Sequence, residues 1–240
     1  MASEDNRRQQ LPTDRQSAEV EAFLRKVKEL PTVKPATAHG RLIFALDATA
    51  SREATWDRAC RLQGEMFEAT AALGGLDVQL VFYRGFGECK ASRWLGTAAD
   101  LHHAMQGVSC AGGETQIARV LSHALKEARR YKVNALVFVG DAMEEKVDEL
   151  CQLAGELRLL GVPVFVFHEG RDAAAGRAFH QIAKLSGGAY CPFDAASAQQ
   201  LRELLGAVAA FAAGGQQALA DYGKRAGGAA LLLAGRVGKE

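Results

Sequence analysis

The residues with the clearest chemical potential follow the first long apolar stretch of the chain. Leu42–Leu46 is an unbroken apolar run, and Asp47, Thr49 and Ser51 come directly after it at alternate positions. One carboxylate and two hydroxyls spaced in this way converge on one point if the chain turns there. A carboxylate combined with neutral oxygens suits a small hard cation such as Mg²⁺ or Mn²⁺.

Two later segments carry side chains of the same kind. Thr115 lies in a glycine-containing loop that enters an expected helix, and Asp141 follows another apolar run. If the strands are parallel, these residues meet at the carboxyl edge of the sheet, where open α/β sheets bind ligands. Two carboxylates and three hydroxyls can supply a six-coordinate cation directly and through water. Taken singly, most of them are also typical helix N-caps, so the prediction depends on their joint spacing.

The elements that must position these residues alternate between strands and helices. Short apolar runs bounded by polar residues are typical of strands buried on both faces. This pattern predicts an α/β fold with a doubly wound, mostly parallel sheet, Rossmann-like, with helices on both faces. The segment after Gly85-Phe86-Gly87 is expected to add one antiparallel edge strand. The expected strands are 42–46, 78–83, 88–94, 134–139, 162–167 and 189–193, and the expected helices are 51–73, 97–105, 116–131, 144–160, 171–185 and 196–213.

The chain has 240 residues, which suits one α/β domain with additional terminal segments. Residues 1–40 form a polar N-terminal segment in which 18–30 is expected to be a short helix. The α/β domain is expected over 41–213. Residues 214–240 are rich in Ala and Gly and are expected to form a flexible tail that carries the apolar patch Leu231–Leu233.

Composition excludes several classes of protein. The formal net charge is +1 with acids and bases interspersed, so no nucleic-acid partner is expected. We expect no secretory signal and no membrane insertion, because the start of the chain is polar and no apolar run reaches transmembrane length. The five cysteines are widely spaced without a CxxC pair, which favours a reducing compartment. The expectation is a soluble cytoplasmic protein, bacterial in its Ala and Gly content.

The three motifs together resemble a von Willebrand factor A-type (VWA) domain with a metal-ion-dependent adhesion site (MIDAS), of the intracellular bacterial type. The resemblance covers roughly 40–212 and rests on Asp-x-Thr-x-Ser, Gly-Gly-x-Thr and a later Gly-Asp. It implies a metal shell and a protein-interaction role in which a partner carboxylate completes that shell. It also implies partners such as ATPases or multi-protein assemblies. The implied metal ligands are Asp47, Thr49, Ser51, Thr115 and Asp141.

Two positions depart from the family pattern. Thr49 stands where Ser is more frequent, which keeps the hydroxyl but adds a methyl group near the ion. Ala142 stands where Gly is frequent. Neither change removes an oxygen ligand, so the site is expected to bind metal.

Two alternatives remain open. Asp47 could serve as the nucleophile of a Mg²⁺-dependent phosphoryl-transfer or hydrolytic enzyme, but a phosphatase would want a second acid at position 49. No other catalytic constellation is identified, so an enzyme is not expected. His168 and Glu169 can flank the site, although capping or surface exposure is favoured. The second alternative is a metal-free scaffold that binds through its helices or through Leu231–Leu233.

Overall fold

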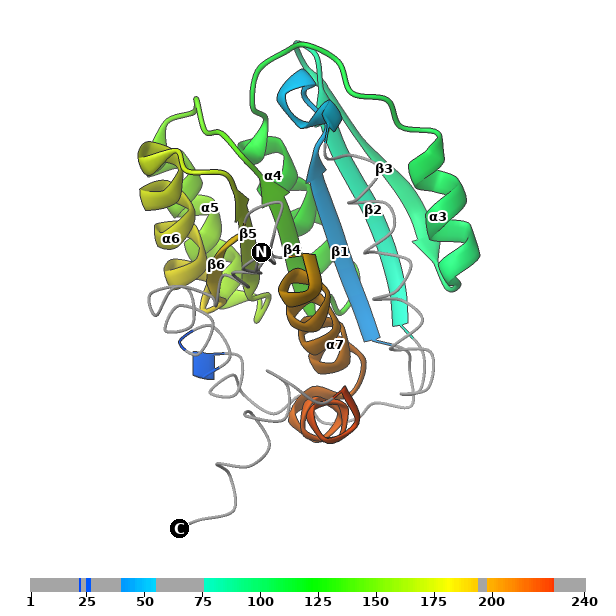
Figure 1. Ribbon diagram of the computed structural model, residues 1–240. Coiled ribbons are helices and arrows are strands. Elements are labelled where there is room, and N and C mark those ends of the chain that lie inside the picture. Colours follow the sequence, from blue (N-terminus) through cyan, green and yellow to red (C-terminus); the bar gives the residue numbers. More distant parts are fainter. Residues whose placement is uncertain (1–21, 23–24, 27–39, 55–75, 194–197, 227–240) are drawn as a thin grey trace, which may run out of the picture.

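The computed structural model describes residues 22, 25–26, 40–54, 76–193 and 198–226. These residues form a six-stranded sheet with helices on both faces (Figure 1). The sheet has the order β3-β2-β1-β4-β5-β6. In chain order the elements are β1 (Gly40–Asp47), the 3₁₀ helix η1 (Ala50–Arg52), β2 (Leu76–Arg84), β3 (Glu88–Leu95), α3 (Ala98–Gln106), α4 (Ile117–Ala128), β4 (Ala135–Gly140), α5 (Val147–Leu159), β5 (Val164–Glu169), α6 (Ala173–Ser186), β6 (Tyr190–Phe193) and α7 (Ala198–Ala226).

The strand directions confirm the predicted fold class. β1 pairs in parallel with β2 on one side and with β4 on the other, and β5 and β6 continue the parallel series. β3 pairs antiparallel with β2 and forms one edge of the sheet. Because β1 lies in the middle, its carboxyl end is flanked by the ends of β2 and β4, and this places Asp47 next to both.

Successive side chains of β1 point to opposite faces of the sheet and bury both faces. Phe44 and Leu46 belong to the core layer that α3 and α7 cover, which also contains Met105 and Phe211. Ile43 and Ala45 belong to the layer under α4, α5 and α6. Figure 1 shows the two groups of helices on opposite sides of the sheet. An unbroken apolar strand is therefore required here, as the sequence pattern indicated.

Helix α7 corrects the prediction of a flexible tail from residue 214. The helix continues to Ala226, and only Gly214 and Gly215 leave helical geometry. Beyond this kink, Tyr222 packs against the core cluster under α7. The close approach of α7 to β1 requires glycine, since a Cβ at Gly40 would lie 2.0 Å from the carbonyl oxygen of Ala212.

Several expectations concern residues outside the described ranges. The expected helix 18–30 is described only at three positions, and Leu231–Leu233 lies wholly outside. The expected helix 51–73 is described only at its start, where η1 is followed by helical Glu53 and Ala54. Among the described helices, none combines the length and the apolar character needed to cross a membrane.

Candidate metal centre

Asp47 ends β1 and is completely buried. Its Oδ1 accepts a hydrogen bond from the backbone N–H of Thr49 at 2.7 Å, and its Oδ2 accepts one from the Tyr83 hydroxyl at 2.9 Å. Burial raises the pKa of Asp47 above its ordinary value; these hydrogen bonds oppose the rise and the charge of Asp141 adds to it. The hydrogen bonds thus hold the carboxylate in one orientation, and its burial disfavours the charged form.

Thr49 and Ser51 lie immediately beyond Asp47, where the chain turns into η1. The two hydroxyl oxygens are 3.0 Å apart. Thr49 occupies the N-cap position of η1, yet its side chain makes no capping hydrogen bond there. The N-cap explanation therefore does not account for this hydroxyl. Asp47 does make a local bond to the second residue after it, as Asx turns do.

Thr115 is buried at the entrance to α4 and is fastened to the loop between β4 and α5. Its hydroxyl oxygen accepts a hydrogen bond from the Glu144 backbone N–H at 3.0 Å, and its own N–H donates to Glu144 Oε2 at 3.1 Å. Glu145, rather than Thr115, caps α4 by accepting from the N–H groups of Ile117 and Ala118 at 2.6 and 2.9 Å. Thr115 is therefore held close to the segment that begins with Asp141.

Asp141 follows β4 and lies near Asp47. A Cβ at the preceding residue, Gly140, would be 3.7 Å from the Cβ of Asp47, and the charge of Asp141 contributes to the raised pKa of Asp47. The Oδ1 atom of Asp141 is buried and has no hydrogen-bond partner among the described residues. A buried carboxylate oxygen without a partner is unfavourable. A cation bound here would compensate both carboxylates, so the side chains present fit a metal ion.

The loop that carries Thr115 is fixed by backbone contacts. Ala111 donates to the carbonyl oxygen of Ala48 at 3.1 Å, and Glu114 donates to that of Gly85 at 3.3 Å. A Cβ at Gly113 would lie 2.2 Å from the carbonyl oxygen of Gly85, so this position requires glycine. The Gly-Gly-x-Thr motif therefore allows close packing of the loop on the end of β2.

The end of β5 differs from its prediction. His168 is buried rather than exposed, and its Nδ1 is 2.9 Å from the Tyr190 hydroxyl. Burial lowers the pKa of His168. Glu169 Oε2 lies 3.1 Å from Nη2 of Arg52, whose side chain is 2% exposed. This ion pair joins η1 to the end of β5, so Glu169 has a structural role next to the candidate site.

The structure places all five predicted ligands at one edge of the sheet, on the segments after β1 and β4 and before α4. Contacts join Asp47 to Thr49 and Thr49 to Ser51, while Glu144 joins Thr115 to the loop of Asp141. In the described part of the chain, no group of three or more His, Cys, Asp or Glu side chains could hold a metal. The predicted shell depends instead on hydroxyl oxygens beside two carboxylates.

Sequence reasoning missed four residues that support this edge: Arg52, Tyr83, Glu144 and Glu145. Tyr83 is separated from Asp47 by 36 residues, and Glu144 is separated from Thr115 by 29. No local spacing links such residues. The available signal was the pair of adjacent acids shortly after Asp141, which is equally typical of the acidic first turn of the expected helix 144–160.

No protein-family model matches this sequence, and no curated protein sequence matches it either. Solved structures do match. The SpRpn10 VWA domain aligns with 75% of this chain and 98% of its own, at 12% identity and a TM-score of 0.54. Proximal thread matrix protein 1 from the mussel byssus, in a structure with a zinc-occupied MIDAS motif, aligns with 71% of this chain at 16% identity and a TM-score of 0.56. The pilus adhesin SpaC from Lactobacillus rhamnosus GG aligns with 80% at 12% identity and a TM-score of 0.57.

These similarities show the fold: the chain has the architecture of a VWA domain. It spans 46% of the mussel protein and 31% of the adhesin, but nearly all of the SpRpn10 domain. The zinc in the mussel protein occupies the same named motif that the sequence resembles.

Proposed function

We propose that this protein is a metal-dependent protein-interaction module in which a cation at the carboxyl edge of the sheet recruits a carboxylate of a partner protein. The observation that carries the proposal is the buried Oδ1 of Asp141, which has no hydrogen-bond partner among the described residues, near the buried carboxylate of Asp47. Two acids that repel one another in a desolvated place favour a bound cation over an apo state.

The residues that would hold the cation are Asp47, Thr49, Ser51, Thr115 and Asp141. Mg²⁺ and Mn²⁺ both suit such an oxygen-rich shell. When bound, the ion supplies a positive charge that attracts an acidic side chain, and this attraction is strongest in a partly desolvated interface. The methyl group of Thr49 is the feature that would restrict the space around the ion.

An enzymatic role for Asp47 is less well supported. A phosphatase would want a second acid two residues after the nucleophile, and that position holds Thr49. We therefore favour binding over phosphoryl transfer.

We propose an acidic protein as the partner, such as a component of an ATPase or of a multi-protein assembly, and the cytoplasm as the location. Within the described ranges, Cys89, Cys110 and Cys151 are free thiols. Free thiols are typical of a reducing compartment.

The experiment that tests the metal site is calorimetric titration of Mg²⁺ and Mn²⁺ into the wild type, Asp47→Ala and Asp141→Asn. Asp148→Ala, which removes an exposed acid from the first turn of α5, is the matched control. We expect saturable binding in the wild type and the control, and none in the two site variants. Wild-type protein that binds neither ion at millimolar concentration would contradict the proposed metal site.

A further inference from the structure

The turn between β2 and β3 carries an aromatic side chain into solvent. Phe86 is 84% exposed and stands between Gly85 and Gly87, which have φ of 59° and 113°. These left-handed conformations favour glycine on both sides of Phe86. The turn therefore has a defined shape with Phe86 at its tip.

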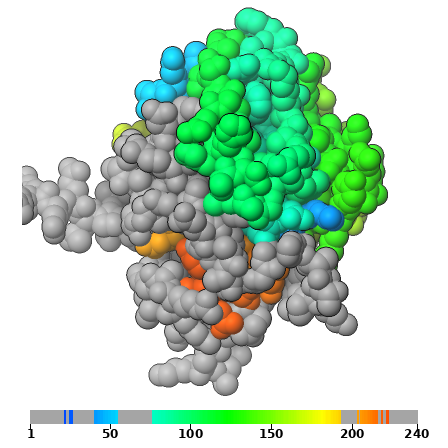
Figure 2. Space-filling model, turned by 90° about the vertical axis from the view of Figure 1, so that its right-hand side faces the viewer, coloured from blue at the N-terminus to red at the C-terminus, as the bar shows by residue number. Residues whose placement is uncertain are grey.

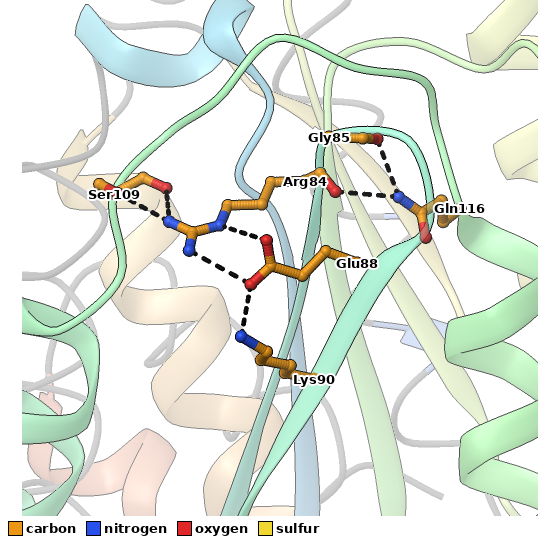
Figure 3. A network of polar contacts seen from close by, with 6 residues as sticks. All are labelled: Arg84, Gly85, Glu88, Lys90, Ser109 and Gln116. Carbon is orange, nitrogen blue, oxygen red and sulfur yellow. Dashed lines mark hydrogen bonds and ion pairs between the residues drawn. The ribbon is translucent and has the colours of Figure 1, made fainter.

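Polar contacts hold this turn in place (Figure 3). The Gln116 amide donates to the carbonyl oxygens of Arg84 and Gly85, both at 3.1 Å. The Arg84 guanidinium donates to Glu88 Oε2 at 3.0 Å and to the carbonyl oxygen of Ser109 at 2.6 Å. The turn is thus fixed by a contact between the ends of β2 and β3 and by contacts to the segment before α4.

A further contact fixes the other side of the tip. Arg119 of α4 donates from Nη1 to the carbonyl oxygen of Gly87 at 2.6 Å. Both residues that flank Phe86 therefore have their carbonyl oxygens bound to the loop or helix that follows. An exposed aromatic on a fixed backbone loses little conformational freedom when it is buried in an interface.

The turn lies next to the candidate metal centre. The carbonyl oxygen of Gly85 accepts from Glu114 and Gln116, the two residues on either side of Thr115. In the space-filling view, the end of the β2–β3 hairpin projects at the top, near the blue segment that follows β1 (Figure 2). The same edge of the sheet therefore presents the metal ligands and Phe86.

The charge around the turn favours an acidic partner. Lys90 is 64% exposed, Arg119 is exposed, and Arg84 lies at the end of β2 beside the turn. Glu88 pairs with both Arg84 and Lys90, and Glu114 is exposed, so three cations stand against two acids around the turn. Such a surface complements a negatively charged protein surface and would accelerate its association. A cation bound at the candidate metal centre would also attract a negatively charged partner.

We infer that Phe86 is the apolar anchor of the partner interface: it inserts into an apolar pocket on an acidic protein whose carboxylate reaches the metal. This inference rests on the proposed function and adds the second determinant of binding. Buried aromatic anchors next to charged contacts commonly dominate interface energies. The partner is thus defined by a pocket for one aromatic ring beside an acidic side chain.

The test begins with p-benzoylphenylalanine placed at position 86 of the full chain in its own cells, followed by photocrosslinking. The same probe at Leu159, which is 87% exposed at the end of α5, is the matched control. We expect one protein to be crosslinked from position 86 in a metal-dependent manner and not from position 159. No product from position 86 would overturn the inference.

The crosslinked protein is then purified and titrated against the wild type, Phe86→Ala, Phe86→Leu and Asp47→Ala in Mg²⁺. We expect Phe86→Ala to weaken binding by at least about tenfold and Phe86→Leu by less. Because Phe86 is exposed, Phe86→Ala should keep the thermal midpoint of the wild type. Wild-type affinity in Phe86→Ala would overturn this inference alone. Unchanged affinity in Asp47→Ala with loss in Phe86→Ala would overturn the metal-dependent function and leave Phe86 as the anchor.

Discussion

Two pairs of charged side chains lie at the same edge of the sheet, each with one fully buried and one partly buried member, and they differ in the sign of their charges. Arg52 and Glu169 form an ion pair at 3.1 Å. Asp47 and Asp141 have the same sign, and one oxygen of Asp141 has no partner within the described residues. The two charges of the first group are opposite and compensate one another within the chain. The two charges of the second group repel one another, and the cation proposed above would compensate them, so we expect the first group to be structural and the second to be functional.

The largest expected effect comes from breaking the neutral group. Glu169→Ala leaves the guanidinium of Arg52, 2% exposed, without this carboxylate. We expect the free energy of unfolding to fall by about 3 kcal/mol, the lower end for a buried pair because Glu169 is 14% exposed. Urea denaturation measures this loss.

The matched control for that variant is Glu156→Ala, which breaks the surface pair between Arg129 and Glu156. Exposed pairs contribute at most about 1 kcal/mol. If both variants lost the same stability, the distinction between the buried pair and a surface pair would not hold.

The second prediction concerns Asp47 and Asp141, where removing a charge should not lower the free energy of unfolding. Asp141→Asn removes one of two repelling charges, so the metal-free protein should be unchanged or more stable by up to about 1 kcal/mol. In the wild type, Mg²⁺ at one hundred times its dissociation constant should add about 2.7 kcal/mol. That addition should be absent in Asp141→Asn. Thermal denaturation with and without Mg²⁺ measures both effects, and a variant that loses stability without metal would contradict the repulsion.

A third, smaller effect tests the hydrogen bond from Tyr83 to Asp47 while the charge of Asp47 is kept. Burial, with the charge of Asp47 added to it, raises the pKa of Tyr83 well above its ordinary value, so the hydroxyl stays a donor throughout the working pH range. Tyr83→Phe removes that donor from Asp47 Oδ2. We expect a loss of about 1–2 kcal/mol in the free energy of unfolding, measured by urea denaturation. No loss would mean that the hydrogen bond contributes nothing to holding Asp47.

The sheet could be predicted from the sequence, because strands buried on both faces appear as short continuous runs of apolar residues. β1, β4 and β5 each contain an unbroken run of apolar residues, and the polar residues at or after the end of each run mark the carboxyl edge. The tight turn at Gly85 indicated the antiparallel edge strand, whereas the order of the strands was not predicted from the sequence. The five candidate ligands could be named for the same reason, since each follows a strand or precedes a helix.

The parts that could not be predicted depend on contacts between distant residues. Glu144 and Glu145 bind backbone N–H groups 27 to 29 positions earlier in the chain, and no sequence period encodes such a pairing. The end of α7 was misplaced for another reason: Gly214-Gly215 normally ends a helix, but here the helix resumes after a kink. The packing of Tyr222 on the core accompanies this second half.

The smallest effect is at the partly exposed carboxylate of Glu88, whose pKa is lowered whereas that of Asp47 is raised. Glu88 accepts from Arg84 and pairs with Lys90, so its pKa is lowered from 4.5 to about 2. The charged form of Glu88 is favoured in the folded state. Its contribution to stability is therefore present above its ordinary pKa and is lost as the pH falls towards about 2. Carboxyl-carbon NMR titration should give a midpoint near 2 in the wild type and a higher one in Arg84→Gln. Equal midpoints in the two proteins would show that the hydrogen bonds from Arg84 in Figure 3 do not set this pKa.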